Sequence, residues 1–402
     1  MTTLLLDLQS NLMGNYGTRD VVLAKGKGSR VWDTEGRMYL DFLGGIAVNN
    51  VGHGHPEVLE AIHAQVDELV HCSNVFLVQP QLELAEKLVA ATGLEKVYFA
   101  NSGTEITEGA MKLARRWAHN TKGAGKHTIL CVEGSFHGRT LGSMSATWSP
   151  KVRENFGPLP EGIRFVKFND LSSVDEQWGE DVCAVLVETV QGEGGVRPCS
   201  KEFLQGLETR CRERGALLLM DEIQCGFGRT GHKFAYQWAG VTPDAVLCAK
   251  AIGGGLPLGA LIAKAEIAEH LNKGSHGSTF GGNPVACAGA CAVVDILFDE
   301  DFLTEVQHKG EYFWKKLLAL KEEFPNLITE VRGPGLMLGL QLTCDGTDIP
   351  VIGRKHGLLF NCTAQTVLRF LPPLTTPMEL FDEAVQKLRT TLVEFQSRQH
   401  QA

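Results

Sequence analysis

The sequence lacks the features that mark several classes of protein. None of its eleven cysteines stands in a C-x-x-C pair, and their odd number does not suit a complete set of disulfides. No apolar run approaches the roughly 18 residues of a membrane span. The 38 Lys and Arg against 47 Asp and Glu give a net charge of −9, whereas nucleic-acid-coating proteins present a basic surface. These absences predict a globular protein that binds neither nucleic acid nor a membrane.

The beginning of the chain also lacks the pattern of an export or organelle address. It contains Leu4-Leu5-Leu6, but Asp7 follows directly and the first cation is Arg19. A signal peptide starts with positive charge, and a transit peptide is rich in arginine. We therefore expect a cytoplasmic protein whose cysteines are reduced thiols, used as small core residues.

Glycine is what the sequence has in excess, with 45 of 402 residues. The glycines gather at 192–195, 226–228, 253–255 and 281–282. Clusters of this kind indicate tight turns rather than a flexible linker. At 402 residues, the length predicts two or three domains.

The middle of the chain alternates short apolar runs with amphipathic stretches. This alternation is typical of a mainly parallel sheet covered by helices on both faces. The expected strands are 96–100, 128–132, 183–188, 216–221 and 245–249, and the expected helices are 104–118 and 201–214.

The two ends of the chain have a different pattern. We expect short strands within 18–42 around a turn at 33–36. Toward the other end we expect a helix at 301–322, strands at 328–342 and 366–370, and a final helix from Pro377. The predicted fold class is α/β, with a large domain over 50–300 and a smaller α+β domain built from 1–49 and 301–402.

A candidate anion site follows the first expected strand. In an open parallel sheet, ligands bind outside the carboxyl ends of the strands. There the chain reads Asn101-Ser102-Gly103-Thr104-Glu105 and enters a helix, whose free N–H groups and positive dipole end favour an anion. A well-capped helix that binds nothing would have the same sequence. The P-loop lysine and the dinucleotide glycine spacing are absent.

Two charged residues end the fourth and fifth expected strands, namely Asp221 and Lys250. Burying a charge is costly without a partner or a function, although Asp221 could cap a helix and Lys250 could reach the surface. Taken together, a phosphate cradle, a carboxylate and a lysine at one sheet edge suit pyridoxal phosphate. The amine binds the aldehyde, and the carboxylate keeps the ring nitrogen protonated.

Six motifs in order carry a resemblance to a known family. They are 101–105, 136–140, 191–195, 221–231, 250–255 and 276–284. On these motifs the chain resembles the class III, fold type I, pyridoxal-phosphate-dependent aminotransferases from about Tyr16 to the last helix. Within that class it is most similar to the acetylornithine aminotransferases. The resemblance implies a transaminase that is a homodimer with shared active sites and that needs no metal.

The resemblance also implies which residues surround the cofactor. The catalytic residues would be Lys250, as the covalent lysine and proton shuttle, and Asp221 at the ring nitrogen. The other implied contacts are Ser102, Gly103 and Thr104 at the phosphate, Phe136 on the ring face, Gln224 at the phenolic oxygen, Glu188 nearby, and Thr279 reaching the phosphate of the neighbouring subunit.

Four further residues are implied at the substrates, N-acetylornithine and 2-oxoglutarate. Arg139 would bind the carboxylate distant from the reacting carbon, and Arg369 the α-carboxylate of glutamate. Glu193 would pair with Arg369 and release it when glutamate arrives. Ser278 would be a further substrate-binding residue. The products would be N-acetylglutamate 5-semialdehyde and glutamate.

The resemblance allows more than one amine donor. Gly45 stands where, by the resemblance, ornithine aminotransferases carry a tyrosine, which leaves room for an acyl group. Succinylornithine, ornithine, 4-aminobutyrate or a diamine remain alternative donors. A catalytically silent paralogue that keeps the fold is the alternative to an active enzyme. Thr189 and Cys225 depart from the usual proline and threonine of the family.

Overall fold

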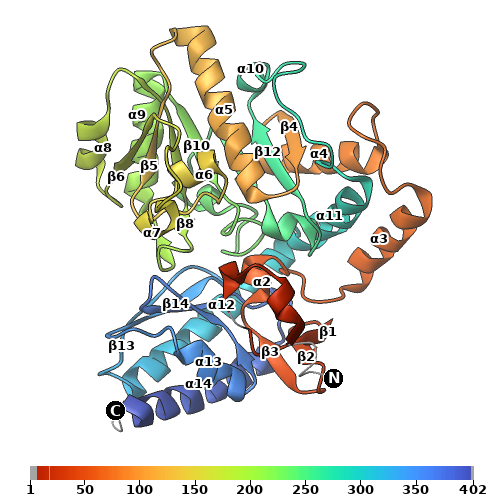
Figure 1. Ribbon diagram of the computed structural model, residues 1–402, viewed down its shortest axis with the longest axis vertical. Coiled ribbons are helices and arrows are strands. Elements are labelled where there is room, and N and C mark those ends of the chain that lie inside the picture. The colour runs from red at the N-terminus through yellow and green to blue at the C-terminus, as the bar shows by residue number, and fades with distance from the viewer. Residues whose placement is uncertain (1–6, 18, 400–402) are drawn as a thin grey trace.

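The computed structural model describes residues 7–17 and 19–399. Residues 1–6 and 400–402, the outer ends of the predicted small domain, lie outside the described residues, as does position 18. Figure 1 shows two bodies. The upper body holds a seven-stranded sheet with its helices. The lower body holds two four-stranded sheets, which contain both the N-terminal and the C-terminal parts of the chain.

The upper sheet has the strand order β4-β12-β11-β10-β7-β5-β6. Only β12 runs against the other six, since it is antiparallel to both of its neighbours. The prediction of an α/β fold with a mainly parallel sheet is thereby confirmed. The strand bounds are β4 Lys96–Ala100, β5 Thr128–Val132, β6 Ile163–Val166, β7 Val182–Glu188, β10 Leu217–Asp221, β11 Ala245–Cys248 and β12 Gly259–Ala263.

Two strands of this sheet, β6 and β12, were not predicted from the sequence. β12 pairs antiparallel with β11, so no crossover helix separates the two, and the alternation of strands and helices that marks a parallel sheet is absent there. β6 is a four-residue edge strand that contains Arg164, so it does not form a clear apolar run. The helix expected at 104–118 is also longer, because α5 spans Gly103–Lys122.

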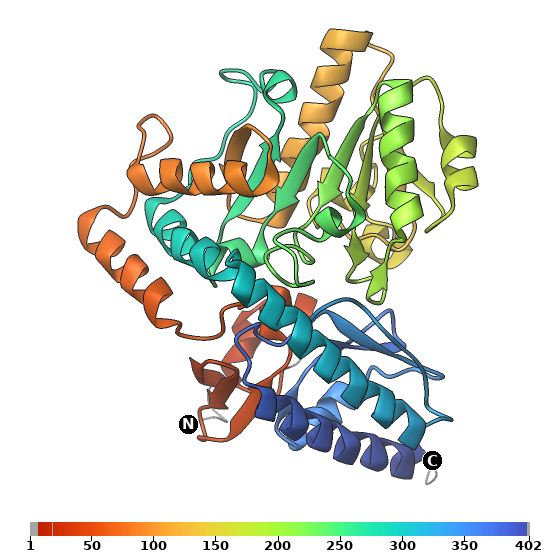
Figure 2. The ribbon, with the colours of Figure 1, turned by 180° about the vertical axis from the view of Figure 1, so that it is seen from behind.

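Side chains of the central strands alternate between the two faces of the sheet, as the strand period of two requires. On β10, Leu217 and Leu219 pack in one buried cluster with the apolar side of α5. Leu218 and Met220 belong to the other cluster, with residues of α9 (Lys201–Arg214) and α11 (Pro284–Leu297). Figure 1 shows α5 in front of the sheet, and Figure 2 shows α9 and α11 on the opposite side.

The lower body interleaves the two ends of the chain. β1 (Leu23–Lys27), β2 (Arg30–Asp33) and β3 (Met38–Asp41) form one sheet with β15 (Leu358–Leu359), which pairs parallel with β3. The second sheet, β13-β14-β17-β16, comes from the C-terminal part alone. This interleaving supports the predicted small domain made of both ends, while its division at 49 and 300 stays a prediction.

The remaining elements connect and cover these sheets. They are α2 Gly44–Ala47, α3 Pro56–Glu68, α4 Gln79–Thr92, α6 Leu141–Ser145, α7 Pro150–Arg153, α8 Leu171–Gln177, α10 Ala265–Ala268, α12 Glu300–Glu323, α13 Ile349–Lys355 and α14 Met378–Gln399, the short helices η1 Leu8–Asn11, η2 Gly14–Tyr16, η3 Ala235–Ala239 and η4 Lys250–Gly253, and the strands β8 Val190–Gln191, β9 Arg197–Pro198, β13 Ile328–Arg332, β14 Leu338–Leu342, β16 Asn361–Thr363 and β17 Val367–Phe370. Figure 2 shows α12 continuing from the end of α11 into the lower body.

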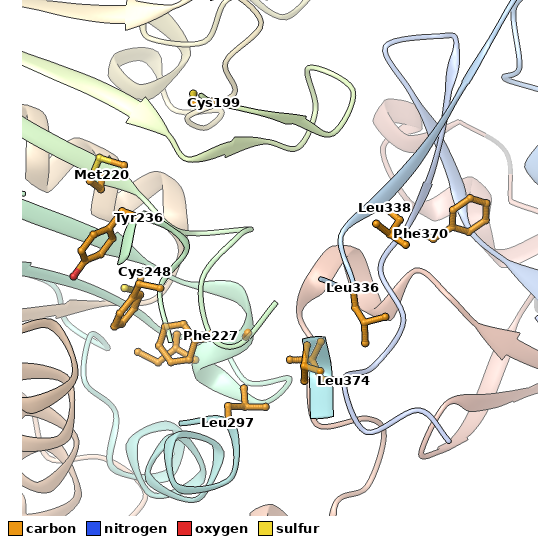
Figure 3. Close-up of a cluster of buried hydrophobic side chains, with 14 of the residues drawn as sticks. Cys199, Met220, Phe227, Tyr236, Cys248, Leu297, Leu336, Leu338, Phe370 and Leu374 are labelled. Atoms are coloured by element: carbon orange, nitrogen blue, oxygen red, sulfur yellow. The ribbon is translucent and has the colours of Figure 1, made fainter. Parts of the chain in front are cut away.

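One apolar core extends from the upper body into the lower one. Met220 and Phe227 of the upper body belong to the same buried cluster as Leu336, Phe370 and Leu374 of the lower body, and Figure 3 shows these side chains together. The shared core fixes the end of β17 relative to the carboxyl ends of the parallel strands. Among the described helices, none combines the length and apolar character needed to cross a membrane.

Candidate active site

A cavity of about 470 Å³ opens at the carboxyl ends of the parallel strands. Its lining residues are Tyr16, Ser102, Gly103, Thr104, Phe136, His137, Gly138, Arg139, Glu188, Glu193, Asp221, Ile223, Gln224 and Lys250. Ten of the thirteen predicted site residues are among them. Another cavity, of about 490 Å³, lies around Tyr98 and His276 and contains none of the thirteen.

The start of α5 forms one wall of the first cavity. Ser102 is the N-cap in extended conformation, and its hydroxyl accepts a hydrogen bond from the Glu105 N–H at 3.4 Å. At Gly103, an added Cβ would lie 2.9 Å from the Ile223 side chain. The first N–H groups of a helix have no acceptor within the helix, and its dipole is positive at this end. This wall is therefore suited to an anion.

A buried acid–imidazole pair lies beyond this wall. Asp221 Oδ2 and His137 Nδ1 are 2.7 Å apart, with the side chains 4% and 0% exposed. The Ile223 N–H donates to Asp221 Oδ1 at 3.0 Å. His137 Nε2 is buried and has no partner among the described residues. The pair fixes the Asp221 carboxylate in the cavity. His137 was not among the predicted site residues, although it follows Phe136 directly.

Glu188 joins two loops of the site. Its Oε1 accepts a hydrogen bond from the Phe136 N–H at 3.0 Å, and its Oε2 accepts one from the Gly192 N–H at 3.2 Å. Burial raises the pKa of Glu188 to about 7, with His137 opposing the shift and Asp221 adding to it. The carboxyl group thereby places the loops that carry Phe136 and Glu193.

Lys250 stands at the start of η4 with a φ of +51°. Residues other than glycine seldom adopt this left-handed conformation, and strained positions of this kind gather at functional sites. No hydrogen-bond or ion-pair partner of the amine is found among the described residues. Burial lowers the pKa of Lys250, and Arg369 adds to the shift while Glu193 and Asp221 oppose it. A lowered pKa increases the fraction of neutral amine near neutral pH, and only the neutral amine can act as nucleophile or base.

Arg369 approaches the site from β17. Its buried Nη1 lies 2.6 Å from Glu193 Oε1 and donates to Gln224 Oε1 at 2.9 Å, while Nε donates to Asn361 Oδ1 at 3.2 Å. Nη2 is buried without a partner. Burial would raise the pKa of Glu193, but the charge and hydrogen bond of Arg369 hold it below its ordinary value. Arg369 does not line the cavity and meets it through Glu193 and Gln224.

Arg139 is different, because its side chain is exposed at the mouth of the cavity. The guanidinium carbon lies 5.4 Å from the centre of the Phe136 ring. Among the described residues, no carboxylate forms an ion pair with it. The guanidinium therefore keeps its donors available for a ligand carboxylate.

Ser278, Thr279 and Gly45 do not line the cavity. The Ser278 hydroxyl accepts hydrogen bonds from Asn101 Nδ2 and the Gly281 N–H, both at 3.0 Å. Thr279 is exposed on the same loop. Because Gly45 is not among the lining residues, the room for an acyl group beside it stays a prediction. Conversely, Tyr16, Gly138 and Ile223 line the cavity but were not predicted as site residues. Of these three, only Gly138 and Ile223 lie inside one of the six motifs.

The family follows from comparison with known proteins. A family model described as aminotransferase class-III matches residues 13–392, so the chain belongs to the class III aminotransferases. It is 46% identical over 379 residues to the acetylornithine aminotransferase of Methanocaldococcus jannaschii, which covers 94% of this chain and 95% of that protein.

Two solved structures are also similar. The N-acetylornithine aminotransferase of Stenotrophomonas maltophilia K279a has a TM-score of 0.84 at 37% identity, covering 96% of this chain and 99% of that one. An ornithine aminotransferase of Toxoplasma gondii, described with partial occupancy of PLP at its active site, has a TM-score of 0.92 at 31% identity, covering 98% and 95%.

Class III aminotransferases are pyridoxal-phosphate enzymes, and the cavity fits that group. An amine with no hydrogen-bond partner, an anion-binding helix start and a fixed carboxylate face the same space. A buried histidine nitrogen and a buried guanidinium nitrogen beside this space have no partner in the part of the chain that the structure describes. Within 7–17 and 19–399, no three His, Cys, Asp or Glu side chains are grouped to hold a metal ion.

Proposed function

We propose that the protein transfers the δ-amino group of N-acetylornithine to 2-oxoglutarate, giving N-acetylglutamate 5-semialdehyde and glutamate, a step of arginine biosynthesis. The observation that carries the proposal is one cavity with a lysine amine that has no partner among the described residues and one exposed arginine, beside which a buried arginine is held by a carboxylate that lines the cavity. The 46% identity to an acetylornithine aminotransferase supports the choice of donor.

Pyridoxal phosphate, when bound, supplies the electron sink that stabilises negative charge on the reacting carbon. The chain's own residues would hold it. The proposed contacts are the start of α5 (Ser102, Gly103, Thr104) for the phosphate, Phe136 for the ring face, Asp221 for the ring nitrogen, Gln224 for the phenolic oxygen, and the amine of Lys250 for the carbonyl carbon. His137 holds the Asp221 side chain in place, and a carboxylate held beside the ring nitrogen would favour the protonated form of that nitrogen.

Lys250 would move the proton. Its neutral amine would take the proton from the reacting carbon of the donor, and the resulting ammonium would return a proton later in the transfer. Burial lowers the pKa of this amine, which increases its neutral fraction near neutral pH.

The two arginines would distinguish the two substrates. N-acetylornithine has one carboxylate far from its δ-amine, and Arg139 would bind it. 2-Oxoglutarate has a second carboxylate beside the reacting carbon, which needs Arg369. Glu193 holds Arg369 until that carboxylate replaces it, and the partly exposed Glu193 can then turn toward water.

A panel of donors tests the proposal. Steady-state rates are measured with N-acetylornithine, N-succinylornithine, ornithine, 4-aminobutyrate and 1,4-diaminobutane, with 2-oxoglutarate as acceptor. We expect the highest kcat/KM with N-acetylornithine. If N-acetylornithine is among the poorest donors, the substrate assignment is wrong. Absence of amine transfer from every donor would instead indicate a silent paralogue.

We also propose a homodimer in which each copy completes the other's site. Val75, Phe76 and Leu77 are 79%, 67% and 78% exposed, and Phe280 is 61% exposed. Contiguous exposed apolar residues mark interaction surfaces. Thr279 lies next to Phe280 and outside its own cavity, which supports its predicted contact with the cofactor phosphate of the second copy.

Mixed dimers test this arrangement. Lys250→Ala chains and Thr279→Ala chains are each expected to be weak alone. Their mixture should regain activity, because one site of the mixed dimer then combines an intact Lys250 with an intact Thr279. Activity that stays at the sum of the separate variants would contradict the shared site.

We place the enzyme in the cytoplasm. Seven of the eleven free cysteines are buried in the core, and the reducing cytoplasm preserves such thiols. Fractionation of the source cells, with activity followed in each fraction, checks this placement.

A further inference from the structure

A network of hydroxyl groups lies beneath the loop that carries Arg139. Thr104 and Glu108 are four residues apart on α5 and therefore share one face of the helix. Thr104 Oγ1 accepts hydrogen bonds from the N–H groups of Arg139 and Thr140, both at 3.2 Å. Ser143 Oγ lies 2.6 Å from Thr104 Oγ1.

Glu108 fixes the far end of the same loop. Its Oε1 accepts hydrogen bonds from the Thr140 hydroxyl and from the Ser143 N–H, the latter at 3.1 Å. The Thr140 N–H in turn donates to Ser143 Oγ at 3.1 Å. The backbone on both sides of Arg139 is thus held by side chains of α5 and by Ser143, which is fully buried.

The loop packs on these groups without spare room. At Gly138, whose φ is +141°, an added Cβ would lie 2.3 Å from Ser143 Oγ and 2.4 Å from Thr104 Oγ1. At Gly142, an added Cβ would lie 2.3 Å from Glu108 Oε2. On the other side, Thr147 Oγ1 accepts a hydrogen bond from the His137 N–H at 2.9 Å. The position of the Arg139 backbone is therefore determined from two sides.

The Thr104 hydroxyl is already engaged by the loop that carries Arg139. A hydroxyl group has two acceptor lone pairs and one proton. The N–H groups of Arg139 and Thr140 point to the Thr104 oxygen, the second of them shared with Ser143 Oγ, and the hydroxyls of Ser143 and Thr140 lie within hydrogen-bond distance of it. A hydrogen bond to a cofactor phosphate would compete with these contacts. The backbone N–H of Thr104, in the first turn of α5, has no hydrogen-bond acceptor among the described residues.

We propose that Thr104, Ser143 and Glu108 are positioning residues for Arg139, and that Thr104 offers the cofactor phosphate only its backbone N–H. Through these three residues, the helix start that binds the phosphate also sets where the arginine presents its charge to the substrate carboxylate. The proposal rests on the proposed function, because it takes Arg139 as the carboxylate ligand.

The test compares variants that keep or remove one hydroxyl. Thr104→Val removes the hydroxyl at nearly constant shape, Thr104→Ser keeps it, and Ser143→Ala removes its buried partner. Each is assayed with N-acetylornithine and with N-acetyl-1,4-diaminobutane, which is the same donor without the carboxylate. The dissociation constant of pyridoxal phosphate is measured separately, by fluorescence quenching of cofactor-free protein.

We expect Thr104→Val and Ser143→Ala to raise KM for N-acetylornithine by about tenfold, the effect of one displaced hydrogen bond on a carboxylate ligand. In Ser143→Ala, KM for the diamine derivative should stay unchanged, and Thr104→Ser should keep the wild-type KM for N-acetylornithine. The dissociation constant of pyridoxal phosphate should stay close to wild type in all three variants.

The opposite pattern overturns the proposal. If Thr104→Val weakens cofactor binding about tenfold and leaves the KM for N-acetylornithine unchanged, the hydroxyl belongs to the phosphate. An equal rise in KM for both donors would indicate a general disturbance of the site. If the wild type does not use N-acetylornithine at all, the proposed function fails, and KM for 2-oxoglutarate then tests the positioning of Arg139 with any accepted donor.

Discussion

Asp221 and Glu222 are neighbours in the sequence and carry the same chemical group, but they lie in different environments. Asp221 ends β10 on the face that turns toward the cavity, and there it pairs with His137. Glu222 turns to the other face and is fully buried. It accepts hydrogen bonds from Thr189 Oγ1 at 2.6 Å, the Ala235 N–H at 2.7 Å and the Tyr236 N–H at 3.0 Å.

The comparison shows that two neighbouring carboxylates at one strand end can have different purposes, one in the candidate site and the other in the stability of the fold. Successive side chains of a strand point to opposite faces, so the first carboxylate faces the cavity and the second faces the protein interior. Burial raises the pKa of Glu222 to about 7, although its three hydrogen-bond donors oppose the shift. We therefore expect changes at Asp221 to reduce the rate and changes at Glu222 to reduce stability.

The largest effect is expected from Asp221→Asn. The amide has no charge to keep the ring nitrogen of the cofactor protonated, a contribution of about 1 to 3 pKa units for an adjacent opposite charge. We predict that kcat falls by about 10- to 1000-fold, while the urea midpoint of unfolding changes little. Stopped-flow rates of the two half-reactions measure the loss. A rate near that of wild type would remove Asp221 from the chemistry.

The second effect is a loss of stability in Glu222→Ala. Three buried donors lose their acceptor, and each unsatisfied buried group costs about 1–3 kcal/mol. We predict a loss of several kcal/mol in the free energy of unfolding, measured with urea on cofactor-free protein. Unchanged stability would show that the three donors find other partners, and the distinction between the two carboxylates would then fail.

The third effect is a pH dependence. The folded protein holds a proton on Glu222 up to about pH 7, whereas the unfolded chain loses it near the ordinary value of 4.5. The stabilising contribution of Glu222 is therefore full below pH 4.5 and declines as the pH rises to 7. The decline is at most about 3 kcal/mol.

Glu222→Gln is the control for this pH dependence. Glu188 titrates equally in both proteins, so its contribution cancels in the difference between their free energies of unfolding. Wild type should lose stability relative to Glu222→Gln between pH 5 and pH 8. A difference that stays constant with pH would contradict the raised pKa.

The smallest effect is expected from Thr189→Val, which removes one of the three donors to Glu222. The remaining two N–H groups still hold the carboxyl group. We predict a loss of about 1 kcal/mol in stability with kcat unchanged, measured by urea unfolding and steady-state assay. A larger fall in kcat than in stability would connect Thr189 to the cavity instead.

The sequence predicted Asp221 but not Glu222, and the reason is physical. Five apolar residues before Asp221 mark a buried strand whose end carries a charge, which is a local signal. The environment of Glu222 is built by Thr189 and by the backbone at 235–236, which reach it only in the folded chain. β12 was missed for a similar reason, because its antiparallel pairing with β11 needs no helix between the two strands.

In the candidate site, too, only residues with a local signal could be predicted from the sequence. Lys250 and the start of α5 each follow the end of a predicted strand and could be recognised there, whereas Arg369 was identified only by resemblance. Its contacts with Glu193 and Gln224 join segments about 145 to 176 residues apart. The hydroxyl network around Thr104 depends on the fold of 138–143 and has no signature in the sequence.

The account depends most directly on the covalent partner of the cofactor. Protein saturated with pyridoxal phosphate is treated with borohydride and digested, and the peptides are analysed by mass spectrometry. The account predicts that the mass of the reduced cofactor is found on Lys250, and that Lys250→Ala protein carries none. The cofactor mass on a different lysine, or on no peptide of the saturated protein, would contradict it.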